Sequence, residues 1–269
     1  MATITAAMVN ELRAKTGQGM MECKKMLTEV GGDIEKAIDA FRKKGVKTSI
    51  SERAATEGRV LVGTSADGKT AAVVEINCNT DFTAKSDTVE EVLKLGVKKL
   101  LGGVKDLSSD EEFKSVITAA AQKTGENVVL GKGIALTGAA AASYLYSTAG
   151  KGKVGVLMSF AGPVGEDVVK NVGMHIVASR PVALTRDGVP ADLVARERDI
   201  AIEQAKATGK PQQIAEKIAD GKMNSFFAER VLLDQEFVNG EVFKGKVSDY
   251  LKQAKAELKD YKRVEVGQA

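Results

Sequence analysis

Two segments in which apolar residues alternate around a turn constrain the fold of this chain most strongly. In residues 58–77 (GRVLVGTSADGKTAAVVEIN), apolar residues alternate on both sides of Asp67-Gly68. Such alternation predicts strands with one buried face, and Asp-Gly is a favoured hairpin turn. Residues 142–160 (ASYLYSTAGKGKVGVLMSF) repeat the arrangement. When the segments are aligned, three residues of the first fall on identical residues of the second: Thr64, Gly68 and Lys69 on Thr148, Gly152 and Lys153. We therefore expect two related halves, each a hairpin with helices on one face.

Helical patterns follow both hairpins and place the chain in the α+β class. After the first hairpin, Thr88 and Glu91 match a capping box that opens a helix. A second helix is expected from about Asp110 to Lys123, followed by a strand within residues 127–136 (NVVLGKGIAL). After the second hairpin, residues 166–178 (EDVVKNVGMHIVA) predict a further helix.

The N-terminal residues predict a small three-helix unit. Apolar residues recur at helical spacing between residues 3 and 45, Gly17 stands where a helix C-cap belongs, and Asp33 is placed to cap the third helix. Residues 46–57 contain few large apolar side chains and are typical of a linker. Because such a unit buries little surface alone, we expect its outer face to serve a partner.

Residues 190–231 predict an antiparallel coiled-coil hairpin that projects from the body. Two helical runs are joined by Gly209-Lys210-Pro211, a stop-and-start signal. Their apolar positions form a narrow seam between charged faces, at Leu193, Ile200, Ala201, Ala205, Ile214 and Ile218. The chain then returns through a helix to the alternating strand YKRVEV. We expect an N-terminal module and linker (1–53), a first core half (54–140), and a second core half (141–269) with the hairpin 190–231 inserted.

Composition argues against several classes of function. The 269 residues carry a net charge of +3, with basic and acidic residues interspersed, so direct nucleic-acid binding is not favoured. One histidine and two distant cysteines provide no zinc motif, and we expect no metal or cofactor. Cys23 and Cys78 are expected to be reduced and packed. We see no signal peptide and no apolar run of the ~20 residues that span a membrane, which predicts a cytoplasmic protein.

Gly63 to Thr70 (GTSADGKT) matches the phosphate-binding loop G-x-x-x-x-G-K-[ST]. That loop requires a helix beginning at its Lys-Thr pair, whereas here an alternating, strand-like segment follows. A hairpin turn is therefore the favoured interpretation, and a P-loop nucleotide-binding enzyme is the alternative function. His175 lies in an apolar helix without a matching nucleophile or carboxylate, which indicates a packed core histidine. Met20 and Met21 suit either a core or an adaptable contact surface.

The segment NTDFTAK (79–85) places a lone aromatic, Phe82, in a polar run between a predicted strand and a predicted helix. Phe82 either folds back on the core or projects as an anchor for a partner, with Asp81 beside it. No nucleophile, base and orienting group can be assembled from the chain. The residues therefore favour binding over catalysis, and we expect that the protein is not an enzyme.

Five ordered motifs resemble bacterial elongation factor Ts, and together they cover essentially the whole chain. The first, LRAKTGQGMMECKKML with GGDIEKAIDAFRKKG, is similar to the ubiquitin-associated-like three-helix module of that family. The second, NTDFTAK, is similar to its Thr-Asp-Phe signature. The segments VGMHIVASRP, GKPQQIAEKIADGKMNSFF and LLDQEFV resemble later family segments in the same order.

The resemblance implies a translation factor that exchanges guanine nucleotide on elongation factor Tu, in both its GDP-bound and its nucleotide-free states. It implies that Asp81 and Phe82, flanked by Thr80 and Thr83, enter the magnesium and GDP site of the partner and dislodge magnesium. It also implies contacts from the N-terminal module through Gly17, Gly19, Met20 and Met21, further contact through the helical hairpin, and a possible higher-order complex.

Three residues depart from the pattern of that family. Thr83 replaces a common valine, in what we expect to be a loop flank. Tyr146 stands where a histidine is often found, so a contact through that position is in doubt. Glu236 replaces a common proline, which is expected to loosen its turn.

Overall fold

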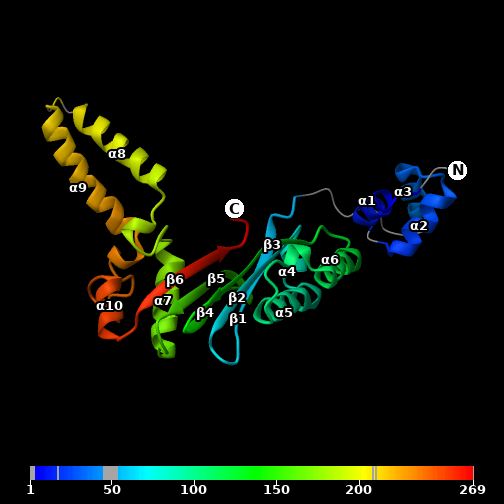
Figure 1. Cartoon of the computed structure of the whole chain (residues 1–269), viewed down its shortest axis with the longest axis horizontal. Coiled ribbons are helices and arrows are strands. Elements are labelled where there is room, and N and C mark those ends of the chain that lie inside the picture. Colours follow the sequence, from blue (N-terminus) through cyan, green and yellow to red (C-terminus); the bar gives the residue numbers. More distant parts are fainter. Residues whose placement is uncertain (1–3, 17, 45–53, 208, 210, 269) are drawn as a thin grey trace.

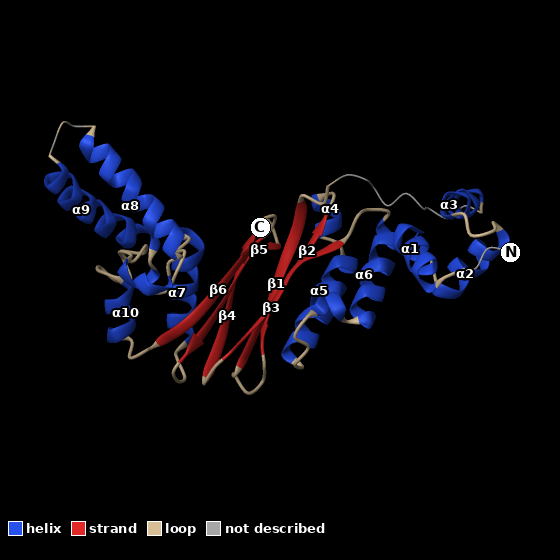
Figure 2. Cartoon of the chain, turned by 45° about the horizontal axis from the view of Figure 1, so that its top comes forward, coloured by secondary structure: helices blue, strands red, loops and turns tan. Residues whose placement is uncertain are grey.

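The computed structural model describes residues 4–16, 18–44, 54–207, 209 and 211–268. Within these ranges the chain folds into ten α-helices and two three-stranded antiparallel sheets, which confirms the α+β class. The two sheets lie in the middle of the body, and helices cover their outer sides (Figure 2). Among the described helices, none combines the length and the apolar character needed to cross a membrane.

Three N-terminal helices pack around a small core of their own. They are α1 (Ala6–Thr16), α2 (Met20–Glu29) and α3 (Ile34–Lys43). The core consists of Val9, Leu12, Cys23, Met26, Leu27, Ala37 and Phe41. Asp33 caps α3, because its Oδ1 accepts a hydrogen bond from the Lys36 amide at 3.0 Å, as predicted. Gly17, the predicted C-cap of α1, lies outside the described residues.

The first sheet has the order β1-β2-β3 and contains the first predicted hairpin. Its strands are β1 (Glu57–Thr64), β2 (Thr70–Cys78) and β3 (Val129–Thr137). One face of β2 packs on α5 (Asp87–Leu101) and α6 (Glu111–Thr124) through Ala72, Val74, Ile76 and Cys78. Cys23 and Cys78 are both buried free thiols, and burial is the main cause that raises the pKa of Cys78 to about 11.

The second sheet repeats this plan in the order β4-β5-β6. Its strands are β4 (Ala140–Thr148), β5 (Lys151–Phe160) and β6 (Leu258–Glu265), and its outer face packs on α7 (Glu166–Ser179) and α10 (Val247–Gln253). The inner faces of the two sheets meet at Val60, Val73 and Leu157. Gly155 allows this approach, because a Cβ there would lie 2.7 Å from Val73 and 2.8 Å from Val60.

The alignment of the two hairpins holds for their first strands only. Thr64 and Thr148 both end a strand, but Gly68 lies in a turn while Gly152 lies inside β5. The first turn comprises residues 65–69, whereas Ala149 and Gly150 alone connect β4 to β5. The two turns therefore differ in length, and one offset cannot align both strands.

Helices α8 (Ala191–Lys206) and α9 (Gln212–Arg230) form a hairpin that projects from the second half (Figure 1). Their buried seam consists of Ala201, Ala205, Ala215, Ala219 and Met223. The predicted seam was wrong at Ile200 and Ile214, which are 40% and 47% exposed. Small alanines let the two helices approach closely, and this turns the isoleucines outward.

The predicted capping box of α5 was also wrong. Ser86, rather than Thr88, is the N-cap, and its Oγ accepts a hydrogen bond from the Val89 amide at 3.3 Å. The helix begins at Asp87 because Ser86 has extended backbone angles while the residues before it already belong to another helical turn. Three 3₁₀ turns complete the described elements: η1 (Leu107–Ser109), η2 (Arg186–Gly188) and η3 (Leu232–Asp234).

Candidate partner-binding site

The segment that carries Phe82 forms a one-turn helix, α4 (Asp81–Ala84), directly after β2. Thr80 is its N-cap, with Oγ1 accepting a hydrogen bond from the Thr83 amide at 3.3 Å. Asp81 follows in the first turn, where a negative charge is favourable. The turn ends where Ser86 begins to cap α5, and the Ser86 hydroxyl donates to the Thr83 carbonyl at 2.7 Å.

Phe82 points away from the core. Its neighbours Thr83 and Ala84 are buried, whereas Phe82 is 81% exposed, the highest value among the exposed large apolar residues of the described chain. Burying a phenylalanine side chain would contribute about 1.5–3 kcal/mol. The fold gains none of this from Phe82, so the interpretation of Phe82 as a cap on the core is wrong. A projecting aromatic on a fixed turn has the geometry of an anchor.

Asp81 is a charged and oriented companion to this aromatic. Its Oδ2 accepts a hydrogen bond from Lys85 Nζ at 3.0 Å, one helical turn away. This hydrogen bond is the main cause that holds the pKa of Asp81 below its ordinary value, and the positive charge of Lys151 adds to it. The carboxylate is therefore ionised at neutral pH and lies on the surface beside Phe82.

The turn between β4 and β5 lies at the same end of the body as α4. Lys151 is buried to 7% exposure, and its Nζ contacts Glu57 Oε2 at 3.1 Å, across the two halves. This hydrogen bond is the main cause that lowers the pKa of Glu57. The Lys151–Glu57 pair thus joins the second hairpin to the start of β1, and Lys151 lies close enough to Asp81 to help lower its pKa.

Glu126 holds the base of α4, a role that the sequence patterns did not reveal. Its Oε2 accepts hydrogen bonds from the amides of Asn79 and Thr80, and its Oε1 accepts from Thr80 Oγ1 at 2.7 Å. Glu126 lies between α6 and β3, 46 residues after Thr80. A helix C-cap glycine, Gly125, precedes it in the sequence and was the one local sign that the chain turns there.

The N-terminal candidate residues form a separate surface. Gly19 is the N-cap of α2, and Met20 and Met21 at the start of α2 are 53% and 77% exposed. These methionines are therefore surface residues rather than core residues. They lie apart from α4 (Figure 1). Gly17 falls outside the described residues.

The structure excludes the geometry of a P-loop at Gly63–Thr70. Gly63 and Thr64 end β1, and Thr70 begins β2, so a strand follows the loop where a P-loop requires a helix. The Ser65 amide donates to the Thr70 carbonyl at 2.8 Å and closes the hairpin. The hairpin prediction is confirmed, and the nucleotide-binding alternative loses its structural basis.

Comparison with known proteins identifies the family of this chain. A family model described as "Elongation factor TS" matches residues 79–268, beginning at the asparagine that precedes α4. The chain is 40% identical over 274 residues to elongation factor Ts of Photorhabdus laumondii, covering all of this chain and 94% of the relative. It is also 40% identical to the protein of that name from Sodalis glossinidius, and 39% identical to that from Yersinia pestis, with all of this chain and 93% of each relative covered. The chain belongs to the elongation factor Ts family.

The three departures from the elongation factor Ts pattern lie in a helix, a β-bridge and a strand. Thr83 lies in α4, not in a loop flank, and is 8% exposed. Glu236 pairs with Lys246 in an antiparallel bridge flanked by two backbone hydrogen bonds, and the expected loosening of its turn stays a prediction. Tyr146, the third, is 43% exposed on β4 near the turn that carries Lys151.

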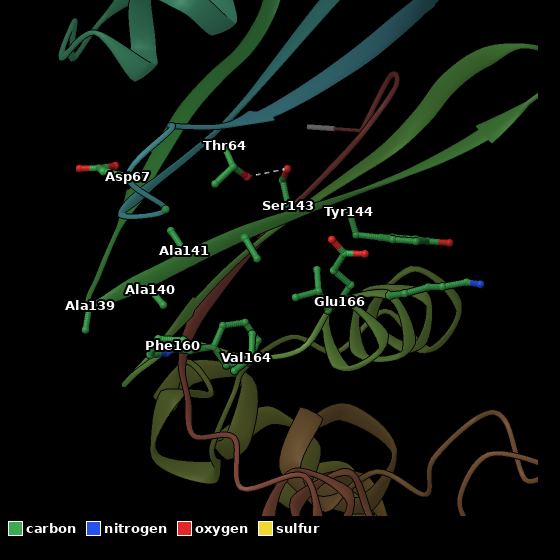
Figure 3. Close-up of a pocket in the computed structure, with 15 residues that line it drawn as sticks. Thr64, Asp67, Ala139, Ala140, Ala141, Ser143, Tyr144, Phe160, Val164 and Glu166 are labelled. Carbon is green, nitrogen blue, oxygen red and sulfur yellow. Dashed lines mark hydrogen bonds between the residues drawn. The ribbon is translucent and has the colours of Figure 1, made fainter.

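A hollow of about 660 Å³ lies away from the Thr-Asp-Phe segment of this elongation factor Ts chain. It is lined by the first hairpin turn, the alanines that begin β4, and the start of α7 (Figure 3). Thr64 and Ser143 hydrogen-bond to each other at 3.1 Å at its edge. None of the described residues predicted to contact elongation factor Tu lines it, whereas Thr64, Asp67 and Gly68 of the P-loop-like segment do.

His175 is a buried structural residue, as predicted. The Val238 amide donates to its Nδ1 at 3.1 Å, so the ring proton lies on Nε2, which faces Gln235 Oε1 at 2.9 Å. The ring stacks on Phe237 at 5.5 Å between centroids. Burial is the main cause that lowers the pKa of His175, and the hydrogen bond to Gln235 opposes it.

Proposed function

We propose that this elongation factor Ts family member promotes the release of GDP from elongation factor Tu by inserting Asp81 and Phe82 near the bound magnesium and nucleotide. The observation that carries the proposal is a phenylalanine that is 81% exposed, beside a charged aspartate, on a turn fixed to the core. Family membership supports the partner. The exchange requires no covalent chemistry, so the protein acts as a binding factor and not as an enzyme.

The physical basis of exchange is the loss of a counter-charge. Magnesium neutralises the diphosphate of bound GDP, and it is the largest local charge in such a site. Phe82 wedges into the partner, while the carboxylate of Asp81 enters beside the groups that order the metal. Dislodging magnesium leaves the diphosphate uncompensated and speeds its release. In this proposal the factor binds both the GDP-bound and the nucleotide-free partner. By linkage, the bound factor weakens the binding of GDP to the same extent as bound GDP weakens the binding of the factor.

Other surfaces are assigned supporting contacts in this proposal. The N-terminal module (1–53) is ubiquitin-associated-like and grips the nucleotide-binding domain of the partner through Gly17, Gly19, Met20 and Met21. The exposure of both methionines suits an adaptable contact. The first core half (54–140) carries α4, and the second (141–269) carries the α8–α9 hairpin (190–231) as an antiparallel coiled coil that also touches the partner. The site of action is the cytoplasm, and the two proteins can assemble into a higher-order complex.

Stopped-flow release of a fluorescent GDP analogue from elongation factor Tu tests the proposal. The wild-type chain should accelerate release, and Phe82→Ala should remove most of the acceleration. Val242→Ala is the matched control, since Val242 is also an exposed apolar residue, at 46%, but lies in the second half. No acceleration by the wild type, or full activity of Phe82→Ala, contradicts the mechanism.

A chelator separates the magnesium step from simple binding. Removal of magnesium should raise the spontaneous release rate and shrink the further acceleration by the wild-type chain, because the metal is already gone. An acceleration of equal size with and without magnesium would show that dislodging the metal is not how the factor acts.

A further inference from the structure

The base of α4 is held by a carboxylate from a distant part of the chain. Glu126 receives hydrogen bonds from the Asn79 amide at 3.2 Å, the Thr80 amide at 3.0 Å and the Thr80 hydroxyl at 2.7 Å. Thr83, buried in α4, is a further cause that lowers the pKa of Glu126. One side chain therefore gathers three donors from the two residues immediately before the exposed Asp81–Phe82 pair.

The backbone around Glu126 is itself well fixed. Gly125 caps α6 in the left-handed conformation, with φ of 70°, and its amide donates to the Ala121 carbonyl. The Glu126 amide donates to Thr124 Oγ1 at 3.3 Å. Three residues after Glu126, β3 begins to pair with β2, where Asn77 faces Val129. Glu126 is thus anchored on both sides by regular structure.

A reciprocal contact runs in the opposite direction. The Asn127 amide donates to Asn79 Oδ1 at 2.8 Å, just beyond the last strand pair of β2 and β3. Asn79 Nδ2 also donates to the carbonyl of Ala54, at the start of the body, at 3.2 Å. The segments 79–80 and 126–127 therefore clamp one another through hydrogen bonds in both directions.

Helix α4 needs an external support of this kind. A single turn fixes several backbone dihedrals for few hydrogen bonds and is unstable by itself. Ala84 packs into the core of the first half, but Phe82 contributes no burial to the fold. Burial raises the pKa of Glu126, but the hydrogen bonds from Thr80 and Asn79, together with the nearby Thr83, outweigh it and lower the pKa below its ordinary value. The clamp is therefore charged at neutral pH, and charge-assisted hydrogen bonds are the stronger kind.

We propose that Glu126 is a positioning residue for nucleotide exchange, which clamps Asn79 and Thr80 so that Asp81 and Phe82 are presented to the partner in one orientation. The proposal rests on the exchange function proposed above. Glu126 touches neither nucleotide nor metal, and it acts through the orientation of α4. It extends the functional site to a residue outside the Thr-Asp-Phe segment.

The first experiment measures the order of α4 without any partner. The chain contains no tryptophan, so Phe82→Trp introduces a single tryptophan at the exposed tip, which is excited selectively over the four tyrosines. Its time-resolved anisotropy is compared in three backgrounds: native Glu126, Glu126→Ala, and Glu111→Ala. Glu111 is the matched control, because its exposed carboxylate pairs with Lys114 on its own helix. Glu126→Ala should increase the fast local motion of the introduced indole, and Glu111→Ala should not. Unchanged motion in a folded Glu126→Ala chain overturns the positioning role.

The second experiment measures exchange with native Phe82, as a function of factor concentration. If Glu126→Ala leaves α4 correctly oriented for one-tenth of the time, the half-saturating concentration rises about tenfold. The maximal release rate should be kept, because binding to the partner restores the orientation, whereas Phe82→Ala should lower that maximum. A fall in the maximum without a rise in the half-saturating concentration contradicts positioning.

Two conservative variants test the chemistry of the clamp and guard against simple misfolding. Glu126→Gln keeps an oxygen that can accept from both amides, so it should lie nearer to the wild type than Glu126→Ala in both experiments. Thr83→Val keeps the shape of the buried side chain and leaves all three donors to Glu126 in place, so its effect should be smaller still. If Glu126→Gln loosens the introduced indole as much as Glu126→Ala does, the hydrogen-bond clamp is wrong. Loosening of that indole in Glu126→Ala, with no acceleration of GDP release by the wild type, would overturn the exchange function but support the positioning of α4.

Discussion

Each half of the body contains a three-stranded antiparallel sheet, but the two halves place an aromatic residue in opposite ways. In the first half, the chain leaves β2 into α4, and a carboxylate clamp holds Phe82 in solvent at 81% exposure. In the second half, His175 and Gln235 form a buried polar pair beside Phe237, which is 6% exposed. In both halves a network of hydrogen bonds fixes a chain segment, but only in the first half does that segment present an aromatic side chain to solvent. The fold therefore provides the support, and the site is a local addition to it.

The strongest test of this difference between the two halves is to replace each aromatic residue, Phe237 and Phe82, by alanine. Phe237→Ala should destabilise the protein by about 3–5 kcal/mol, as expected for a buried phenylalanine. Phe237 stacks on His175 and Tyr250, with centroid distances of 5.5 and 4.5 Å. Phe82→Ala should change stability by no more than about 0.5 kcal/mol, because the side chain is exposed. Urea unfolding of both variants measures the difference, and equal losses would refute the division of roles.

In the exchange assay, Phe82→Ala should have the larger effect and Phe237→Ala the smaller, which is the reverse of their order in the stability measurement. Phe82→Ala should slow GDP release from elongation factor Tu by about thirtyfold or more, equivalent to roughly 2 kcal/mol, the loss typical of an anchor residue. Phe237→Ala, assayed at a temperature where it remains folded, should retain most activity. A larger loss of exchange in Phe237→Ala than in Phe82→Ala would place the functional surface in the second half.

The buried pair in the second half makes a prediction about pH. The pKa of His175 in the folded state lies below its ordinary value of 6.5, mainly because of burial. The unfolded chain therefore binds a proton near pH 6.5 while the folded chain does not, so stability is complete above that pH and falls as the pH drops below it. Because His175 is the only histidine, this loss can be assigned to it.

A variant at His175 tests that assignment. His175→Leu should lose about 1–3 kcal/mol at pH 8, since the Val238 amide and Gln235 lose a hydrogen-bond partner. It should also flatten the pH dependence of stability between pH 7 and pH 5. Denaturant melts at several pH values measure both effects. A wild-type-like slope in the variant would show that another group causes the loss.

Local patterns predicted the elements of this fold but not the relations between distant residues. Alternation around Asp67-Gly68 and spacing in residues 166–178 depend on near neighbours, and both elements form where expected. In α4, either Phe82 or the pair Thr83 and Ala84 can face the core. The short polar run in the sequence does not decide between these two orientations. Glu126 contacts Thr80 across 46 residues, so no local spacing could reveal the clamp.

Helix details were harder to predict because competing residues stand close together. Ser86 and Thr88 are both good N-caps, and the choice between them was made by α4, whose end leaves Ser86 extended. In the α8–α9 hairpin, the larger Ile200 and Ile214 were expected to fill the seam, but alanines permit a closer approach of the helices. Tertiary packing decided both cases.

The smallest expected effect concerns the ion pair on α4, and it separates orientation from charge within the site. Lys85→Met removes the partner of the Asp81 carboxylate, but both side chains are 44% exposed, and such pairs contribute little to stability. The pKa of Asp81 should rise toward its ordinary value, because the hydrogen bond from Lys85 is the main cause of its lowering. Asp81 nevertheless stays ionised at neutral pH, and Glu126 still holds the turn.

Exchange should therefore stay within about threefold of the wild type, whereas Asp81→Asn, which removes the charge itself, should slow it more. NMR titration of Asp81 with the stopped-flow assay measures both quantities. A loss of exchange in Lys85→Met as large as that in Asp81→Asn would mean that the ion pair, rather than the free carboxylate and its clamped turn, is what the partner recognises.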